Sequence, residues 1–296
     1  MQNTGKSMQV PLRSELTREP RPWAEAFPLA VVDGRLEVRL ARSDEEIARS
    51  QALRYQIFYR EMAALATPAM DAARRDFDAF DALCDHLLVI DREEKGPNNV
   101  VGTYRLLRQA VAEKHDGFYS ADEYDLTPLL GHPVLNPPGK GGLMELGRSC
   151  VRRDHRNTAT IQLLWRGIAA YMEAHAITAL FGCASLPGVD PKAHAQPLSY
   201  LHHNHLAPED LRVRAVAERY EEMNLLPADQ INARRAFMAL PPLVKGYIRL
   251  GAHIGQGAVV DHQFGTTDVF VLLPVERIGE RYFGHFDRGD RASRRG

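Results

Sequence analysis

The segment LMELGRSCVRRDHRNTATIQLLW (143–165) constrains the fold most, because it joins a strand-like run to a helix-like run across a short charged turn. Residues 143–151 have the length and apolar content of a buried strand. From residue 158 on, apolar residues recur at helical spacing, and Asn157 or Thr158 is suited to cap the helix. The helical apolar positions are Ile161, Leu164, Trp165, Ile168 and Met172. A strand that leads directly into such a helix favours an α/β protein.

Further strands and helices follow the same alternating order along the chain. SDEE (43–46) matches a capping box, which predicts a helix from there to about Met62. A turn at 92–99 joins two strand-like runs into a hairpin, and LPPLVKGYIRL (240–250) predicts a short apolar helix. Strands are predicted at 36–43, 86–91, 100–108, 177–186 and 268–275. This order predicts a mixed central sheet flanked by helices.

The domain boundaries follow changes in composition along the chain of 296 residues. Residues 1–34 are rich in Pro, Arg and Glu without clear periodicity, and we expect an N-terminal extension there. The main domain is predicted at 35–286, with a mostly helical insertion at 187–241. The basic end of the chain, 287–296, is predicted to be a disordered tail.

Charge and cysteine content exclude several classes of protein. The formal net charge of -1 gives no general attraction to nucleic acid, so none is expected as a partner. Cys84, Cys150 and Cys183 have no disulfide-like spacing, which indicates a reducing compartment. The sequence contains neither a signal-peptide pattern nor an apolar run of 18 residues. We therefore expect a cytoplasmic protein, with peripheral association at the inner membrane left open.

Two charged residues inside the predicted strand 143–151 need an explanation. Unpaired charges are costly to bury, yet Glu145 and Arg148 both lie in this apolar run. A regular strand would direct residues three apart to opposite faces, and Gly147 between them is suited to host a bulge. We interpret the strand as part of a functional site.

The turn after this strand is strongly basic. Its cationic and imidazole groups are Arg152, Arg153, His155 and Arg156, and the residues Asn157, Thr158 and Ala159 open the following helix. Free amides at a helix N-terminus attract anions, so these residues together predict a local anion site. The alternative is an ordinary solvated basic turn.

This strand, turn and helix resemble the Gcn5-related N-acyltransferase fold. In that fold the equivalent turn binds the phosphates of a pantetheine-bearing acyl donor through the loop Gln/Arg-x-x-Gly-x-Gly/Ala. Here the aligned run is Arg-Asn-Thr-Ala-Thr-Ile (156–161), in which both glycine positions are altered. The change is easier to reconcile with the single phosphate of an acyl carrier protein's prosthetic arm than with coenzyme A.

A series of dispersed motifs gives a more specific resemblance over roughly residues 36–286. The motifs are R-x-x-x-F (54–58), D-x-x-D (78–81), G-x-x-R-L-L (102–107) and E-x-x-R (145–148). Their order and spacing resemble the acyl-homoserine-lactone synthases. FDAFDALCDHLLVI (77–90), ELGRSCV (145–151) and the segment 240–273 resemble the L-ornithine N-alpha-acyltransferases even more.

The resemblance implies transfer of a 3-hydroxyacyl group from acyl carrier protein to the alpha-amine of L-ornithine, which gives lyso-ornithine lipid. The 4'-phosphopantetheine group would arrive on the donor, so no bound cofactor is expected. Glu145 is the candidate base; alternatively, it only holds a partner arginine. The residues Arg54, Asp78, Asp81, Arg105 and Arg148 either clamp the zwitterionic amino acid or form a buried ion-pair network. Phe58 is expected to pack beside them.

Other patterns are less informative, and other functions stay open. LHHNH (201–205) contains three histidines, but no further ligands follow at suitable spacing, so no metal site is predicted. The nearest alternative activity is that of an autoinducer synthase acting on S-adenosylmethionine, and another amino acid as acceptor is a further one. A non-enzymatic alternative is a protein that binds acyl chains or membrane surfaces.

Overall fold

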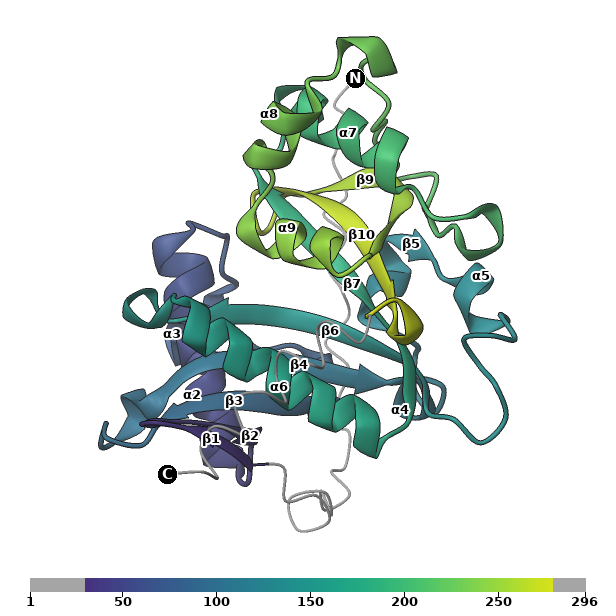
Figure 1. Ribbon diagram of the computed structural model, residues 1–296. Helices are drawn as coiled ribbons and strands as arrows, with labels where there is room; N and C mark the ends of the chain where they lie inside the picture. The colour runs from purple at the N-terminus through teal and green to yellow at the C-terminus, as the bar shows by residue number, and fades with distance from the viewer. Residues whose placement is uncertain (1–29, 279–296) are drawn as a thin grey trace, which may run out of the picture.

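The computed structural model describes residues 30–278, which contain ten strands in the order β1-β2-β3-β4-β6-β7-β10-β9-β8-β5 (Figure 1). One half of the sheet consists of β1 (Ala30–Asp33), β2 (Leu36–Leu40), β3 (Asp85–Asp91), β4 (Val100–Arg108) and β6 (Gly142–Val151). The other half consists of β7 (Ile177–Pro187), β10 (Thr266–Pro274), β9 (His253–Asp261), β8 (Arg214–Ala215) and β5 (Tyr124–Asp125). Neighbouring strands are antiparallel, except for the parallel pairs β6–β7 and β8–β9.

Two long helical segments cover the first half of the sheet. These are α2 (Asp44–Tyr55), which continues as the π-helical turn η1 (Gln56–Glu61), and α6 (Thr158–Ala174). Leu87 and Val89 of β3 share a hydrophobic cluster with residues of α6. Leu88 and Ile90 share another cluster with residues of α2. Because alternate residues of β3 pack against different helices, this strand is buried on both faces, which explains its continuous apolar sequence.

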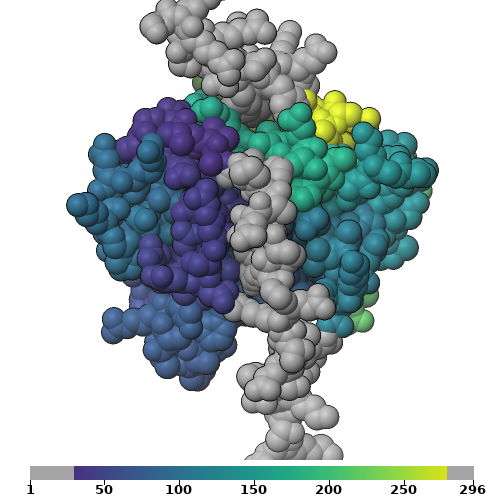
Figure 2. Space-filling view, turned by 90° about the horizontal axis from the view of Figure 1, so that it is seen from below, coloured from purple at the N-terminus to yellow at the C-terminus, as the bar shows by residue number. Residues whose placement is uncertain are grey.

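The remaining helical elements are shorter. The α-helices are α3 (Pro68–Ala73), α4 (Gln109–Ala112), α5 (Thr127–Leu130), α7 (Ala195–His205), α8 (Ala233–Ala239) and α9 (Pro242–Arg249). Two 3-10 turns, η2 (Ala79–Ala82) and η4 (Tyr119–Asp122), carry residues used below. In the view from below, the purple N-terminal segment with β1, β2 and α2 reaches the surface (Figure 2). None of the helices within residues 30–278 is long and apolar enough to cross a membrane.

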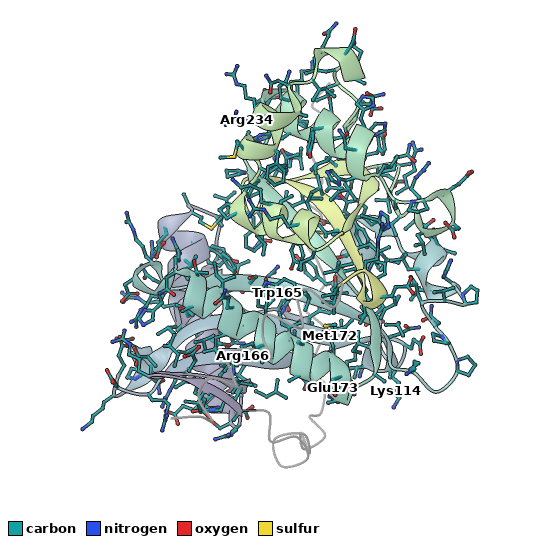
Figure 3. All side chains as sticks on the ribbon, viewed as in Figure 1. Lys114, Trp165, Arg166, Met172, Glu173 and Arg234 are labelled. Atoms are coloured by element: carbon teal, nitrogen blue, oxygen red, sulfur yellow. The ribbon has the colours of Figure 1, made fainter. Side chains whose placement is uncertain are left out.

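The caps predicted for the two long helices are confirmed. The Ser43 side chain accepts a hydrogen bond from Glu46 N, and Asn157 accepts one from Thr160 N. The Glu46 carboxylate binds the Arg39 side chain and Arg42 N, so it does not complete a reciprocal capping box. On α6, Trp165 contacts the ring of Tyr247 in α9, whereas Arg166 pairs with Asp33 of β1 (Figure 3). This helix therefore connects the two halves of the sheet.

The central strands β6 and β7 pair over only part of their length. Their parallel ladder ends at the pair Glu145 and Phe181, although β6 continues to Val151 and β7 to Pro187. The β4–β6 ladder shifts register between Thr103 and Arg105, which marks a bulge in β6. The bulge predicted in this strand is therefore present, but the left-handed residue is Arg148, with φ of 51°, rather than Gly147. The two half-sheets diverge beyond Glu145.

The predicted strands and long helices are present, and the differences lie in smaller elements. β9 was not predicted, because the glycines in GAHIGQGAVV (251–260) interrupt an alternating pattern. Gly257 has a φ of 86°, and a Cβ there would lie 2.4 Å from the Tyr220 ring, so the position requires glycine. Residues 30–33, at the end of the predicted extension, form β1. The segment 187–241 contains α7 and α8 together with the short strand β8. The rest of the predicted extension, and the tail at 287–296, lie outside the described residues.

Candidate active site between the diverging strands

A cavity of about 640 Å³ occupies the space where β6 and β7 diverge. Residues of β4, β6, β7, α6, α9 and η4 line it, together with the turn between β9 and β10. One part of the lining is apolar and consists of Ile57, Phe58, Met62, Ile161, Leu164, Trp165 and residues 241–244. The polar part includes Arg105, Tyr119, Ser120, Glu123, Glu145, Arg148, Cys183, Asp261 and Asp268. A cavity with one apolar and one polar part suits an amphiphilic ligand.

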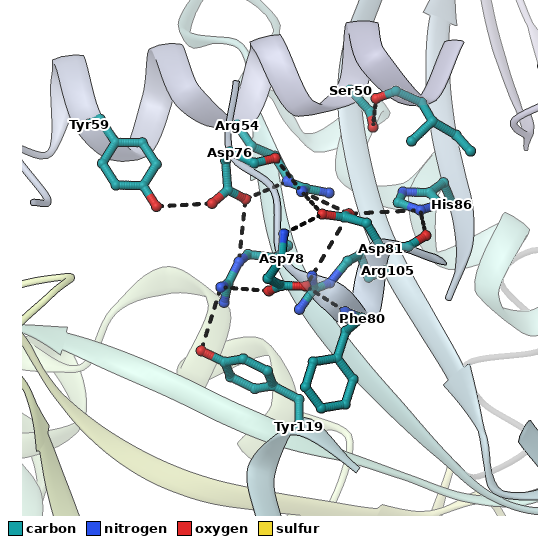
Figure 4. A network of polar contacts seen from close by, with 12 residues as sticks. Ser50, Arg54, Tyr59, Asp76, Asp78, Phe80, Asp81, His86, Arg105 and Tyr119 are labelled. Carbon is teal, nitrogen blue, oxygen red and sulfur yellow. Dashed lines mark hydrogen bonds and ion pairs between the residues drawn. The ribbon is translucent and has the colours of Figure 1, made fainter. Parts of the chain in front are cut away.

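The arginines and aspartates predicted from the motifs form one buried network (Figure 4). Arg54, which is fully buried, donates from Nε to Asp76 at 2.6 Å and from Nη2 to Asp81 at 2.8 Å. Arg105 donates to Asp78 at 2.5 Å. Three arginines thus face three aspartates, once Arg148 is included, and the charges balance.

Asp76 is a network member that the motif analysis missed. It accepts hydrogen bonds from Arg54 and, at 2.9 Å, from the hydroxyl of Tyr59, and it lies 3.4 Å from Arg148 Nε. The sequence feature that could have identified Asp76 is its position in the acidic run 71–81, next to the D-x-x-D motif. Burial disfavours ionisation of the neighbouring Asp78, but the charges of Arg105 and Arg148 outweigh burial and hold the pKa of this carboxyl below its ordinary value.

Asp78 and Asp81 also build the local backbone. They form a reciprocal capping box around η2, in which Asp78 accepts from Phe80 N and Asp81 accepts from Asp78 N. His86 hydrogen-bonds the carbonyl oxygen of Asp81 at 3.0 Å, and its burial lowers the pKa of the imidazole to about 4. These contacts favour the scaffold interpretation for most of the network.

Arg148 extends from the network into the cavity, which Arg105 also lines. Its guanidinium lies 4.9 Å from the Tyr119 ring and 4.8 Å from the Phe264 ring. It also lies 3.2 Å from Asp78. Stacking between two rings fixes the orientation of the guanidinium plane. Phe58, predicted to pack here, lies edge-on to Phe264 and lines the cavity.

Glu145 lines the cavity and is 4% exposed. Its carboxylate accepts hydrogen bonds at 2.8 Å from the backbone amides of Tyr119 and Ser120 and at 2.5 Å from the Ser120 hydroxyl. Its partner is therefore the turn η4 rather than an arginine. Burial raises the pKa of the Glu145 carboxyl and outweighs the opposing effect of these hydrogen bonds. The group combines a fixed position with a raised affinity for protons.

The charged side chains of the predicted basic turn, residues 152–156, do not converge on one binding site. His155 is buried and hydrogen-bonds Asp91 at 3.1 Å, and Arg152 binds Glu94 and Asp154. The prediction of one shared anion site is wrong, because Asp91 at the end of β3 and Glu94 after it compensate these two side chains. Asp91, Glu94 and His155 offer atoms within 4.8 Å of one another, as metal ligands do, but Arg152 and Arg35 already bind them.

Arg156 is the residue of this turn that lines the cavity. It donates to the Val151 carbonyl oxygen at 2.8 Å and to Glu61 at 2.7 Å. Asn157 caps α6. The side chains of Arg153, Thr158 and Ala159 are exposed. The amide end of α6 and Arg156 therefore remain as the candidate phosphate-binding groups.

A second acidic group lines the opposite side of the cavity and was not predicted. It consists of Glu123, after η4, and Asp268 in β10, with Asp261 at the β9–β10 turn. The residues come from separate segments. The segment 240–273 contributed to the family resemblance, but no role was predicted for Asp261 or Asp268 within it. Cys183 lies beside them, 3.4 Å from Glu123 and 3.5 Å from the Ser120 hydroxyl. Burial raises the pKa of the Cys183 thiol well above its ordinary value, so the thiol is a weak nucleophile and direct attack by the acceptor is favoured.

The chain is similar to a family of known acyltransferases. Residues 53–166 match the family described as acetyltransferase (GNAT) domain. The L-ornithine N(alpha)-acyltransferase of Agrobacterium fabrum is 51% identical over 255 residues, covering 86% of this chain and 85% of the relative. The enzymes of the same name from Brucella abortus and Rhodobacter capsulatus are 51% and 44% identical, covering 86% and 85% of this chain and 89% and 95% of their own lengths.

A comparison with solved structures gives a match of low sequence identity. FeeM, an N-acyl amino acid synthase from uncultured soil microbes, superposes with a TM-score of 0.45 at 12% identity. The superposition covers 82% of this chain and 93% of that one.

Proposed function

This chain belongs to the family of L-ornithine N(alpha)-acyltransferases, and from that premise we propose that it transfers a 3-hydroxyacyl group from acyl carrier protein to the α-amine of L-ornithine. The product is lyso-ornithine lipid. The observation that carries the proposal is the identity of 51% over 86% of the chain. The cavity at the divergence of β6 and β7 supplies a place for the reaction.

The reaction needs a neutral amine, a fixed thioester and a proton acceptor. The α-ammonium of ornithine loses a proton, its nitrogen attacks the thioester carbonyl carbon, and the C–N bond forms as the C–S bond breaks. The nitrogen then loses its second proton, and the departing thiolate takes up a proton to leave as the thiol, so the net proton released is the one accepted by the base. We assign Glu145 as the base, because it lines the cavity and burial raises the pKa of its carboxyl.

The donor would enter along the diverging strands. Backbone groups of β6 and β7 beyond Glu145 are free of mutual pairing there, and they are suited to hydrogen-bond the amides of the 4'-phosphopantetheine arm. Arg156 and the N-terminus of α6 lie at the same side of the cavity and would bind its phosphate. The apolar lining from Ile57 to Trp165 would receive the acyl chain.

The partners follow from this chemistry. The pantetheine group belongs to the donor, so the protein needs no cofactor of its own. Acyl carrier protein is expected to be acidic and would be steered by Arg153 and Arg156. The product is an amphiphile with one acyl chain, which would favour a cytoplasmic protein that associates peripherally with the inner membrane.

The test is a reconstituted reaction with purified protein and 3-hydroxyacyl-acyl carrier protein. Ornithine, lysine, glutamine and S-adenosylmethionine are offered separately, and thiol release and product mass are measured together. We expect one thiol per amide product with ornithine. Turnover with S-adenosylmethionine alone would indicate an autoinducer synthase. The absence of turnover from folded protein with every acceptor would favour a protein that only binds acyl chains.

A further inference from the structure

The acidic group on the β10 side of the cavity has more negative charge than its surroundings compensate. Glu123 is 6% exposed and Asp268 is 7% exposed, and both line the cavity. Arg219 Nη2 lies 3.1 Å from Glu123 Oε1 and is the one cation paired with these carboxylates in residues 30–278. Asp261, nearby, accepts hydrogen bonds from the amides of Gln263 and Phe264.

Asp268 has an unused hydrogen-bond acceptor. Its Oδ1 atom is buried and has no hydrogen-bond partner in the part of the chain that the structure describes. A buried carboxylate oxygen without a donor is costly. Burial raises the pKa of the Asp268 carboxyl to about 6, against the effect of the hydroxyls of Thr266 and Ser185. Burial, and after it the charge of Asp268, raises the pKa of Glu123 to about 7.

A chain of contacts crosses the cavity from its arginine side to its acidic side. Arg148 stacks on the ring of Tyr119, whose backbone amide binds Glu145. The Ser120 hydroxyl bonds Glu145 and contacts Cys183, which contacts Glu123. Glu145 therefore lies between a guanidinium at one end and uncompensated carboxylates at the other. This polarity matches a molecule with a carboxylate at one end, an amine beside it and a second cation at the far end.

We propose that Glu123 and Asp268 form the subsite for the side-chain ammonium of the acceptor amino acid, a role that rests on the proposed function. The acceptor's carboxylate then faces Arg148, and its α-amine lies near Glu145. An ammonium group supplies the donor that Asp268 Oδ1 lacks and compensates the second carboxylate charge. The subsite selects a basic amino acid of suitable length over its neutral analogues.

The test compares ornithine with norvaline, which has the same carbon chain and α-amine but no side-chain amine. Initial rates are measured with 3-hydroxyacyl-acyl carrier protein for the wild type, Asp268→Asn and Glu123→Gln. We expect the wild type to prefer ornithine by on the order of 100-fold in kcat/KM, because a buried ionic partner is left unpaired by norvaline. Each variant should reduce this preference at least tenfold, through a higher KM for ornithine and little change with norvaline.

Asp122→Asn is the matched control, since Asp122 precedes Glu123 and is exposed. It should keep the wild-type preference, and thermal unfolding establishes that each variant is folded. Equal losses with ornithine and norvaline would overturn the subsite, because they would place the carboxylates at the α-amine or in the scaffold. An unchanged preference would overturn it too. If the wild type acylates neither amino acid, the proposed function itself fails, which is a different result.

Discussion

Two buried groups of charges lie beside the same cavity, and they differ in their balance of positive and negative charges. One group reaches the cavity through Arg105 and Arg148, and the other lines it with Glu123, Asp261 and Asp268. The network around Arg54 sets three arginines against three aspartates and holds the pKa of Asp78 below its ordinary value. The group around Glu123 sets several carboxylates against Arg219, and burial raises the pKa values of the Glu123 and Asp268 carboxyls. The comparison teaches that burial alone does not reveal a binding site. A balanced group stabilises the fold, whereas an unbalanced group is completed by a ligand.

The largest expected effect tests the balanced network. Arg54→Met should lower the free energy of unfolding by about 3–5 kcal/mol, because Asp76 and Asp81 would lose the guanidinium that binds both of these buried carboxylates. Urea unfolding at pH 7 measures the change. Arg49→Met is the control: its partner Glu45 is exposed, and the loss should stay below about 1 kcal/mol. Similar losses of stability for both variants would show that the buried network around Arg54 contributes no more than an exposed ion pair.

The next effect concerns Glu145, which lies between the two groups. Glu145→Gln keeps the side-chain shape and should lower kcat about 10²–10³-fold, because the variant cannot accept a proton. Its pH–rate profile should also lose the acidic limb that the wild type shows. If kcat falls while that limb persists, Glu145 positions η4 through Tyr119 and Ser120 and is not the base.

A smaller effect tests the unbalanced group through the pH dependence of stability. Glu123 has an ordinary pKa of 4.5, which folding raises to about 7, so the folded state favours the protonated form. The stabilisation is complete below about pH 4.5 and is lost as the pH rises through 7. Glu123→Gln resembles the protonated form. Relative to the wild type, its free energy of unfolding should therefore rise by about 1–2 kcal/mol between pH 5 and pH 8. A difference that does not change with pH, or that changes in the opposite direction, would show that Glu123 is compensated.

The smallest effect lies at the mouth of the cavity. Arg156→Gln should raise the KM for the acyl carrier protein donor about three- to tenfold, because a partly exposed charge contributes modestly. The KM for ornithine should not change. Arg153→Gln is the matched variant, because Arg153 lies one turn away and outside the cavity lining. It should make the KM for the donor depend less on ionic strength, without changing that KM at high salt. The pair of variants therefore separates phosphate binding from general electrostatic attraction.

The sequence predicted the balanced group well and the unbalanced group not at all. Arg54, Asp78, Asp81, Arg105 and Arg148 belong to motifs with fixed spacing, and capping chemistry located α2 and α6. Each of these signals is local, within one turn or one strand. The position of the bulge was wrong by one residue, because Arg148 adopts the left-handed conformation that a glycine would be expected to take.

Glu123 and Asp268 could not be predicted, because they are far apart in the chain and only tertiary structure brings them to one cavity. The end of the turn η4 places Glu123 there, and the strand β10 places Asp268 there. The opposite error occurred at the basic turn. His155 and Arg152 had no evident partner in the sequence, but Asp91 ends β3 and Glu94 follows it, and the β3–β4 hairpin brings both to the turn. Charge compensation between distant segments determined both outcomes.

The early end of the β6–β7 ladder has a consequence for how the enzyme handles its donor. Beyond Glu145, each strand presents an open edge inside the molecule, where edges are normally paired or covered. In the proposed function, a pantetheine arm in this gap would act as a temporary strand and complete the sheet. Donor binding then adds to the free energy of folding, and amide hydrogens of 146–149 and 182–185 should exchange more slowly in the donor complex. Dissociation of the thiol product would open the sheet again. The gap between β6 and β7 would therefore couple turnover to release of the carrier protein.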